Sequence, residues 1–166
     1  VGVQDIVLAA GLTKPTLYHY FGSKRGLLEA LLEREAAPVV ESVMQAAVYE
    51  GDLVRSLENT AIAYFKQAKD SHQFYRMSLA MQVAPPESES YRAIQPYARK
   101  QQRAVEELFC LAVEDHGNMR GRHQRYAASF LGQINAWVRL SLQGEWGLDD
   151  QAAFQLVHQF MHGIFS

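Results

Sequence analysis

The sequence contains little of what stabilises secreted, membrane or low-complexity proteins. Cys110 is its single cysteine, which excludes an internal disulfide framework and favours a reducing compartment, so we expect a cytoplasmic protein. No apolar run approaches the roughly 20 residues that span a bilayer, and no signal peptide is visible, so no membrane partner is expected. The 11 glycines and 5 prolines among 166 residues are too few for a low-complexity chain.

Positive charge is also scarce, because 16 Lys and Arg face 18 Asp and Glu and the net charge is −2. A nucleic-acid partner would therefore need positive charge that is concentrated in one place. The first 25 residues contain three cations, Lys14, Lys24 and Arg25, against one acid, Asp5, which gives a local charge of +2. The one stretch with an excess of positive charge thus lies at the start of the sequence.

Hydrophobic periodicity predicts helices almost everywhere, and alternating strand patterns are rare, so the predicted fold class is all-α. Ser23 and Asp149 are expected to cap helices, and Pro38 is expected to kink or break one. The helix at 52–69 is predicted to turn an apolar face inward, made of Leu53, Leu57, Ala61, Tyr64 and Phe65. The predicted helices cover residues 3–10, 13–20, 23–49, 52–69, 72–83, 91–115, 122–144 and 149–165.

Residues 3–20 read as helix, glycine turn, helix, which is the arrangement that places a second helix in the DNA major groove. The second helix is rich in hydroxyl groups and also carries a cation and an imidazole, whereas only Leu17 and Phe21 look like core residues. Such side chains suit contacts with phosphates and base edges. Lys24 would add a cation beside the backbone N–H groups that begin the next helix.

The run from Asp5 to Leu28 resembles the helix-turn-helix of tetracycline-repressor (TetR-type) transcriptional regulators, through Leu17-Tyr18-x-x-Phe21, Ser23-Lys24 and the leucines that follow. The resemblance implies that Lys24 binds a phosphate. It also implies that seven residues approach the groove: Thr13, Lys14, Pro15, Thr16, Tyr18, His19 and Tyr20. The family's first helix is absent from the sequence, and because residue 1 is Val, we expect the natural chain to start earlier.

The resemblance further implies a division into a helix-turn-helix domain with a connecting helix, residues 1–48, and a helical ligand-binding and dimerisation domain, residues 49–166. The second domain is rich in aromatic residues and methionines, which could form an ordinary core or a largely apolar effector pocket. The predicted pocket residues are Tyr64, Phe74, Met77, Met81, Phe109, Phe130 and Trp137. Polar candidates within the same helices are Asn59, Thr60, Gln133 and Asn135.

The last two predicted helices carry apolar residues on more than one face, so each needs a partner on both sides. Two such helices from each of two subunits would form a four-helix homodimer interface. The predicted interface residues are Ala128, Leu131, Ile134, Val138, Phe154, Val157, Phe160, Met161 and Ile164.

No catalytic set, metal-ligand cluster or phosphate-binding glycine loop is found, so neither an enzyme, a metal nor a cofactor is expected. His158 and His162 share a helix face and could chelate a metal, but packing at a helix interface is the favoured interpretation. Cys110 is expected to be buried as a small hydrophobic residue.

The sequence therefore predicts a homodimeric repressor that binds a palindromic double-stranded DNA operator and is released from it by a largely apolar small molecule. The alternative is an α-helical small-molecule-binding protein without DNA binding. A salt-dependent gel shift would separate the two.

Overall fold

The computed structural model describes residues 23–163 of the chain. It also describes Gly2, Gln4, Val7, Leu8, Gly11, Thr13 and Pro15. Within residues 23–163, six α-helices and one short 3₁₀ helix form, and no strand. The all-α prediction is confirmed.

The connecting helix α3 (Lys24–Ala46) begins where the sequence predicts, because Ser23 caps it. The Ser23 hydroxyl accepts a hydrogen bond of 3.1 Å from the backbone N–H of Gly26. The helix continues through Pro38 without the break that was one of the two expected outcomes. Eight of its side chains are buried, including Leu27 and Val43, so tertiary packing holds the helix together across the proline.

Three helices follow, and two of them begin at side-chain caps. They are α4 (Leu53–Asp70), α5 (His72–Gln82) and α6 (Glu89–Ala112). Asp52 accepts from the Arg55 N–H at 3.0 Å, and Ser88 accepts from the Tyr91 N–H at 3.2 Å. All residues of the predicted inward face of α4 are buried: Leu53, Leu57, Ala61, Tyr64 and Phe65.

The last helices lie within a few residues of their predicted bounds. They are α7 (His123–Leu142) and α8 (Asp150–His162), preceded by a 3₁₀ helix, η1 (Gly117–Met119), that was not predicted. Asp149 caps α8 by accepting from the Ala152 N–H at 2.8 Å, as predicted. None of the helices in the described part of the chain has the length and hydropathy that a membrane-spanning segment requires.

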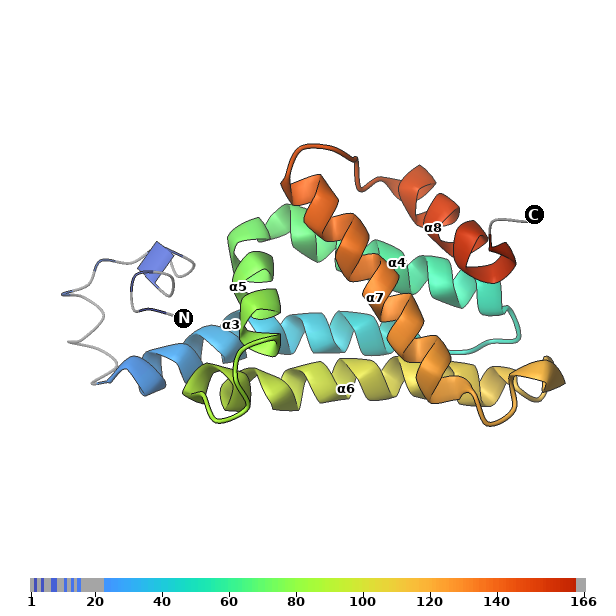
Figure 1. Cartoon of the computed structure of the whole chain (residues 1–166), viewed down its shortest axis with the longest axis horizontal. Coiled ribbons are helices and arrows are strands. Elements are labelled where there is room, and N and C mark those ends of the chain that lie inside the picture. The colour runs from blue at the N-terminus through green and yellow to red at the C-terminus, as the bar shows by residue number, and fades with distance from the viewer. Residues whose placement is uncertain are drawn as a thin grey trace.

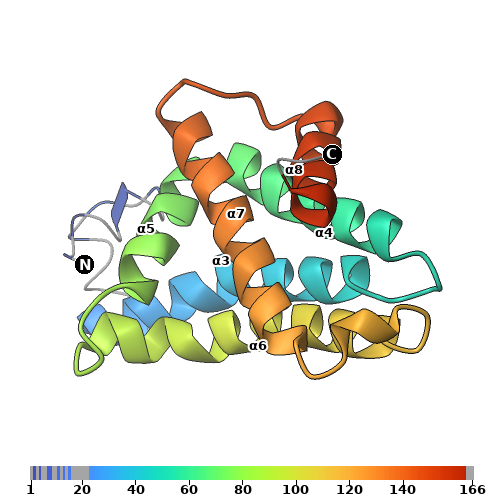
Figure 2. The same ribbon diagram turned by 45° about the vertical axis from the view of Figure 1, so that its right-hand side comes forward.

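Helices α3 and α6 lie side by side along the molecule, with α7 crossing over them and α8 packed near α4 (Figure 1; Figure 2). Two hydrogen bonds show that α3 and α6 run in the same direction. The Tyr97 hydroxyl donates to Glu33 at 3.1 Å within the two helices, and the Tyr49 hydroxyl donates to Asp115 at 2.5 Å just after both helices end. The connecting helix is thus fastened to α6 along most of its length.

The buried side chains form two hydrophobic clusters that meet along α3. The proximal cluster joins the first half of α3 to α5 and the start of α6, and it also contains Val7 of the N-terminal unit. The distal cluster joins the second half of α3 to α4, α6, α7 and α8. Ala36 belongs to the proximal cluster and Val39 to the distal one, so Pro38 lies at their boundary.

Candidate functional site

The described positions of the N-terminal unit agree with a helix, a glycine turn and a second helix. Gly11 has a φ of +64°, which favours glycine, and its N–H donates to the Leu8 carbonyl at 3.3 Å. Pro15 is helical and exposed, as expected for a proline in a first turn. Val7 is 7% exposed and packs in the proximal cluster, so this unit is attached to α3 through apolar contacts.

Lys24 is the first residue of α3 and is exposed. The guanidinium of its neighbour Arg25 donates a hydrogen bond of 2.8 Å to Glu29. This hydrogen bond raises the pKa of the Arg25 guanidinium. No acid among the described residues pairs with Lys24. Lys24 therefore offers a cation beside the N-terminal N–H groups of α3, which is the arrangement that favours an anion.

Most of the predicted groove contacts lie outside the residues that the structure describes. Thr13 and Pro15 are described and exposed. Five predicted contacts lie outside the described residues: Lys14, Thr16, Tyr18, His19 and Tyr20. Their role stays a prediction.

A partly open pocket of about 300 Å³, here called the inner pocket, lies where the two clusters meet. Its walls come from five helices, and Ala36 and Val39 of α3 both line it. The other lining residues used below are Tyr64, Phe74, Tyr75, Ala98, Gln101, Ala128, Gly132 and Asn135. Its size is at the lower end of the range for small-molecule sites.

Two tyrosine–amide pairs form the polar part of the inner pocket. The Tyr64 hydroxyl donates to Gln101 Oε1, and the Tyr75 hydroxyl donates to Asn135 Oδ1, each at 2.7 Å. Burial raises the pKa of both phenols, so both stay uncharged at neutral pH. The pairs connect α4 to α6 and α5 to α7 across the pocket.

Two of the seven predicted pocket residues, Tyr64 and Phe74, line the inner pocket. Met77 and Met81 lie in the proximal cluster, so their role is packing. The other three predicted pocket residues pack elsewhere: Phe109 and Phe130 meet edge to face with ring centroids 6.4 Å apart in the distal cluster, and Trp137 packs on Trp146. These five residues do not line the inner pocket, and their role in effector binding stays a prediction.

Sequence reasoning missed Gln101 and Tyr75, although one signal was present. Gln101 stands between Tyr97 and Val105 on the inward stripe of α6, where the other residues are apolar or aromatic. A polar residue on such a stripe points to a buried hydrogen bond. Among the polar candidates, Asn135 lines the pocket, whereas Thr60 bonds its own helix through the Ser56 carbonyl at 2.7 Å.

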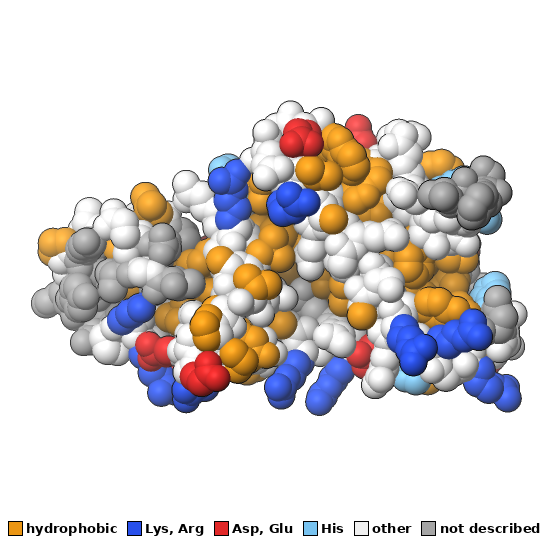
Figure 3. All heavy atoms as spheres, viewed as in Figure 1, with side chains coloured by type: hydrophobic (Ala, Val, Ile, Leu, Met, Phe, Trp, Pro, Cys, Tyr) orange, Lys and Arg blue, Asp and Glu red, His pale blue; other side chains and the backbone are white. Residues whose placement is uncertain are grey.

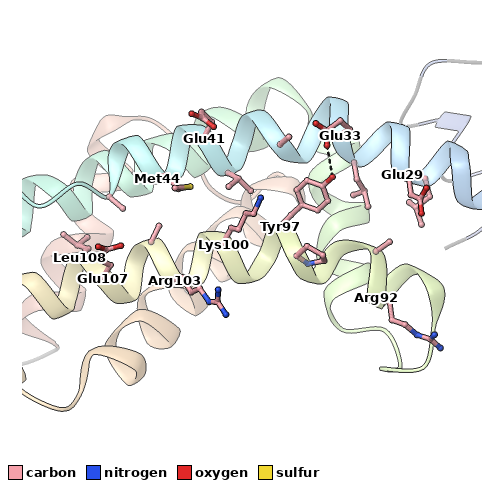
Figure 4. Close-up of a pocket in the computed structure, with 18 of the residues that line it drawn as sticks. Glu29, Glu33, Glu41, Met44, Arg92, Tyr97, Lys100, Arg103, Glu107 and Leu108 are labelled. Atoms are coloured by element: carbon pink, nitrogen blue, oxygen red, sulfur yellow. Dashed lines mark hydrogen bonds between the residues drawn. The ribbon is translucent and has the colours of Figure 1, made fainter.

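A larger surface groove of about 1280 Å³, here called the outer groove, follows α3 and α6 on another side (Figure 4). Tyr97 and Lys100 point from α6 toward α3, whereas Arg92 and Arg103 point away from it. The groove is edged by six acids, including Glu29, and four bases, so charges of both signs lie along it. None of the seven predicted pocket residues lines this groove.

The predicted interface residues separate into core and surface. Ile134, Val138 and Val157 are fully buried in the distal cluster, so they cannot face a partner, and these three assignments are corrected. Phe160 is mostly packed against Phe130, with ring centroids 5.2 Å apart.

The remaining predicted interface residues are more accessible. Phe154 is 50% exposed and Met161 is 37% exposed on α8, and hydrophobic side chains are visible over α7 and α8 in Figure 3. Ala128 and Leu131 line the inner pocket from α7, and Ala128 is also exposed. Ile164 lies outside the described residues.

The structure also shows the surroundings of Cys110 and of the pair His158 and His162. Cys110 is exposed rather than buried, because Phe109 and Ala112 occupy the inward face of α6 at this point. His158 and His162 stack on α8 with ring centroids 4.7 Å apart, and both are exposed. Among the described residues, no group of three or more His, Cys, Asp and Glu could hold a metal ion.

Comparisons with known proteins agree on one family. The family model "Bacterial regulatory proteins, tetR family" matches residues 1–31. The chain is 26% identical over 166 residues to the HTH-type transcriptional activator FasR of Mycolicibacterium smegmatis, which covers 99% of this chain and 74% of the relative.

Two solved structures show the same fold over nearly the whole chain. The TetR family transcriptional regulator PfmR from Thermus thermophilus has a TM-score of 0.74 at 19% identity, covering 100% of this chain and 90% of that one. The transcriptional regulator FadR from Bacillus subtilis, in complex with stearoyl-CoA, has a TM-score of 0.75 at 15% identity, covering 99% and 89%. The chain is thus similar to TetR-family transcriptional regulators, through the family model on residues 1–31 and through the shared fold of its helices.

Proposed function

We propose that the protein binds an operator through its N-terminal unit and changes its operator affinity when a small molecule occupies the inner pocket. One observation carries the proposal: Ala36 and Val39, which line the pocket, belong to the same helix that begins with Lys24 at the N-terminal unit. An occupant that moves these two side chains also moves α3. A DNA-bound role places the protein in the cytoplasm.

The two clusters explain how such a movement would reach the DNA. The first half of α3 packs with Val7 of the N-terminal unit, whereas the second half packs with α4, α7 and α8. The pocket lies between these two bodies, so its occupancy favours one relative orientation of them. Coupling between sites requires such an element with two arrangements, and both sites must bias it.

The solved structure of FadR with stearoyl-CoA supports an acyl compound as the class of effector. The lining of the inner pocket is about equally polar and apolar, and its apolar part, which includes Phe74 and Ala98, would suit a segment of an acyl chain. Its volume of about 300 Å³ fits part of a long-chain molecule, and the rest would extend toward the surface.

We also infer a homodimer through α7 and α8, as is typical of the family. Phe154 and Met161 give α8 an exposed apolar stripe. Gly132, in the middle of α7, is exposed, and a Cβ added there would meet nothing within 4 Å. Glycine inside a helix is unfavourable by about 1 kcal/mol relative to alanine, and no close contact within the chain requires it at this position, which borders the inner pocket. Close approach of a partner helix would explain it.

The test measures operator affinity by fluorescence anisotropy, with DNA from the region upstream of the protein's own gene and stearoyl-CoA as the probe. We expect specific binding to this DNA and at least a roughly fivefold change in its affinity when the probe is added, since typical allosteric coupling is about 1–3 kcal/mol. Ala98→Phe, which fills the inner pocket, should abolish the change. Ala80→Phe is the matched control, because Ala80 is exposed on α5 and lines neither the inner pocket nor the outer groove.

Absence of specific DNA binding would instead support the α-helical small-molecule-binding protein. An effector response that survives in Ala98→Phe would place the effector elsewhere.

The direction of regulation has two candidates. The sequence-based hypothesis is a repressor that the effector releases. The name of the M. smegmatis relative, a transcriptional activator, favours the opposite sign. A reporter gene behind the bound promoter separates them: deletion of the regulator raises expression if it represses and lowers expression if it activates.

A further inference from the structure

The inner pocket has no charged wall. Among the described residues that line it, none is Asp, Glu, Lys, Arg or His. The polar atoms are hydroxyls and amides, and burial keeps the two phenols protonated. The one charged side chain that hydrogen-bonds a described lining residue is an acid, since Gln102 donates to Glu106 at 2.8 Å. Nothing in this wall would neutralise a buried anion.

The hydrogen bonds within the pocket leave donors unused. Each tyrosine gives its proton to an amide oxygen, of Gln101 or of Asn135, so both amide oxygens have partners. Neither amide nitrogen donates to another described residue. Every fully buried side-chain nitrogen or oxygen among the described residues has a partner, so these two nitrogens must touch open space. They lie on residues that line the pocket.

We propose that the inner pocket selects an uncharged molecule through acceptor oxygens that receive hydrogen bonds from the amide groups of Gln101 and Asn135. The proposal rests on the proposed function in taking this pocket as the effector site. Carbonyl compounds such as esters fit this chemistry. An ionised carboxylate also accepts hydrogen bonds, but it would bring an unpaired charge into a wall without a cation. An ammonium group would find no acid among the lining residues.

Three probes of equal chain length separate these classes: methyl octanoate, octanoate and octylamine. Direct binding to the protein is measured by isothermal titration calorimetry at pH 7.5, where octanoate is an anion and octylamine a cation. We expect methyl octanoate to bind at least about tenfold more tightly than either ion. Octanoate binding as tightly as the ester would overturn the proposal, and so would the failure of all three probes to bind.

Asn135→Asp gives the sharper test. The variant keeps an oxygen to accept from Tyr75, removes the amide donor and adds a negative charge to the wall. Methyl octanoate should lose about tenfold in affinity, and octylamine should gain by a similar factor. Asn59→Asp is the matched control, because Asn59 is exposed on α4 and lines neither the inner pocket nor the outer groove. It should leave all three affinities unchanged.

Gln101→Glu makes the same replacement beside Tyr64, and it keeps the proposal testable if Asn135→Asp does not fold. An unchanged order of affinities in a folded variant of either residue would overturn the assignment of the amide donors. Operator affinity is measured on the same samples, which keeps the two proposals separable. If the ester binds without altering operator affinity, the pocket chemistry stands and the coupling fails. If stearoyl-CoA alters operator affinity while no octyl probe binds, the coupling stands and the pocket chemistry fails.

Discussion

Replacing Pro38 by alanine tests how α3 connects the two clusters. Pro38 is exposed inside a continuous 23-residue helix, and it has no N–H to donate to the Arg34 carbonyl four residues earlier. Ala36 on one side and Val39 on the other both line the inner pocket. Pro38→Ala restores the missing donor and removes the ring, and it changes no side chain that lines the pocket.

The effect on stability can be estimated from the structure. Proline inside a helix is unfavourable by about 3 kcal/mol relative to alanine. Proline also restricts the unfolded chain, and losing that restriction offsets about 1 kcal/mol of the gain. Because Pro38 is exposed, the substitution removes no core contact, and we expect a net stabilisation of about 2 kcal/mol. Urea unfolding would measure it, and in a chain of this size the thermal midpoint would rise by roughly 4–8 °C.

The functional consequence is measured separately, as the ratio of operator affinities with and without stearoyl-CoA. If α3 bends at Pro38, the straightened helix should change this ratio while leaving effector affinity for the DNA-free protein nearly unchanged. Pro96→Ala is the matched control, because Pro96 is an exposed proline inside α6, which is not the connecting helix. It should stabilise the protein comparably and leave the ratio as in the parent.

Two results would refute this reasoning. A stabilised Pro38→Ala variant with the parental ratio would mean that Pro38 has no part in signalling. A Pro96→Ala variant that changes the ratio as much as Pro38→Ala would mean that overall stability, and not a bend in α3, controls the response.

Three further predictions follow from the described residues. Lys24→Ala should weaken binding to all DNA sequences alike, and because each subunit of the dimer loses one phosphate contact, it should reduce the slope of log affinity against log salt by about 2, as gel shifts at several salt concentrations would show. Phe154→Glu should yield folded monomers by analytical ultracentrifugation, whereas Val83→Glu, at a still more exposed apolar position after α5, should not. Burial raises the pKa of Tyr64 and Tyr75, so the unfolded chain loses these protons first above pH 10. Stability should therefore fall as pH rises beyond about 10, and in Tyr75→Phe this fall in urea unfolding should be shallower.

Helix type and most helix ends could be predicted because they depend on local chemistry. Ser23, Asp52 and Asp149 each accept a hydrogen bond from a backbone N–H at the start of a helix, and such capping is visible in the sequence. The expected kink or break at Pro38 depended on local chemistry alone. Around it, buried residues such as Leu32 and Val43 hold α3 in place from both sides. A buried leucine contributes about 2 kcal/mol, so several of them outweigh one proline.

The pocket could be predicted only in part, because aromatic content does not distinguish core from cavity. Phe109, Phe130 and Phe74 are all phenylalanines within predicted helices. Phe109 and Phe130 nevertheless fill the distal cluster, whereas Phe74 borders the pocket. The distinction depends on which helices meet, and periodicity within one helix does not contain that information. The interface residues Ile134 and Val138 were misassigned for a related reason, since an apolar helix face points toward whichever neighbour lies closer.

An uncharged occupant has a physical consequence for how the pocket could act on α3. Such a molecule cannot attract the helix by charge, so its effect must come from the volume that it fills between the two clusters. An occupant that pushed the side chains of Ala36 and Val39 would apply a bending force to α3 on both sides of Pro38. At Pro38 the backbone hydrogen bond to the Arg34 carbonyl is missing. The helix would then bend at that point before the leucine contacts of the proximal cluster gave way, and Val7 would carry the movement into the N-terminal unit.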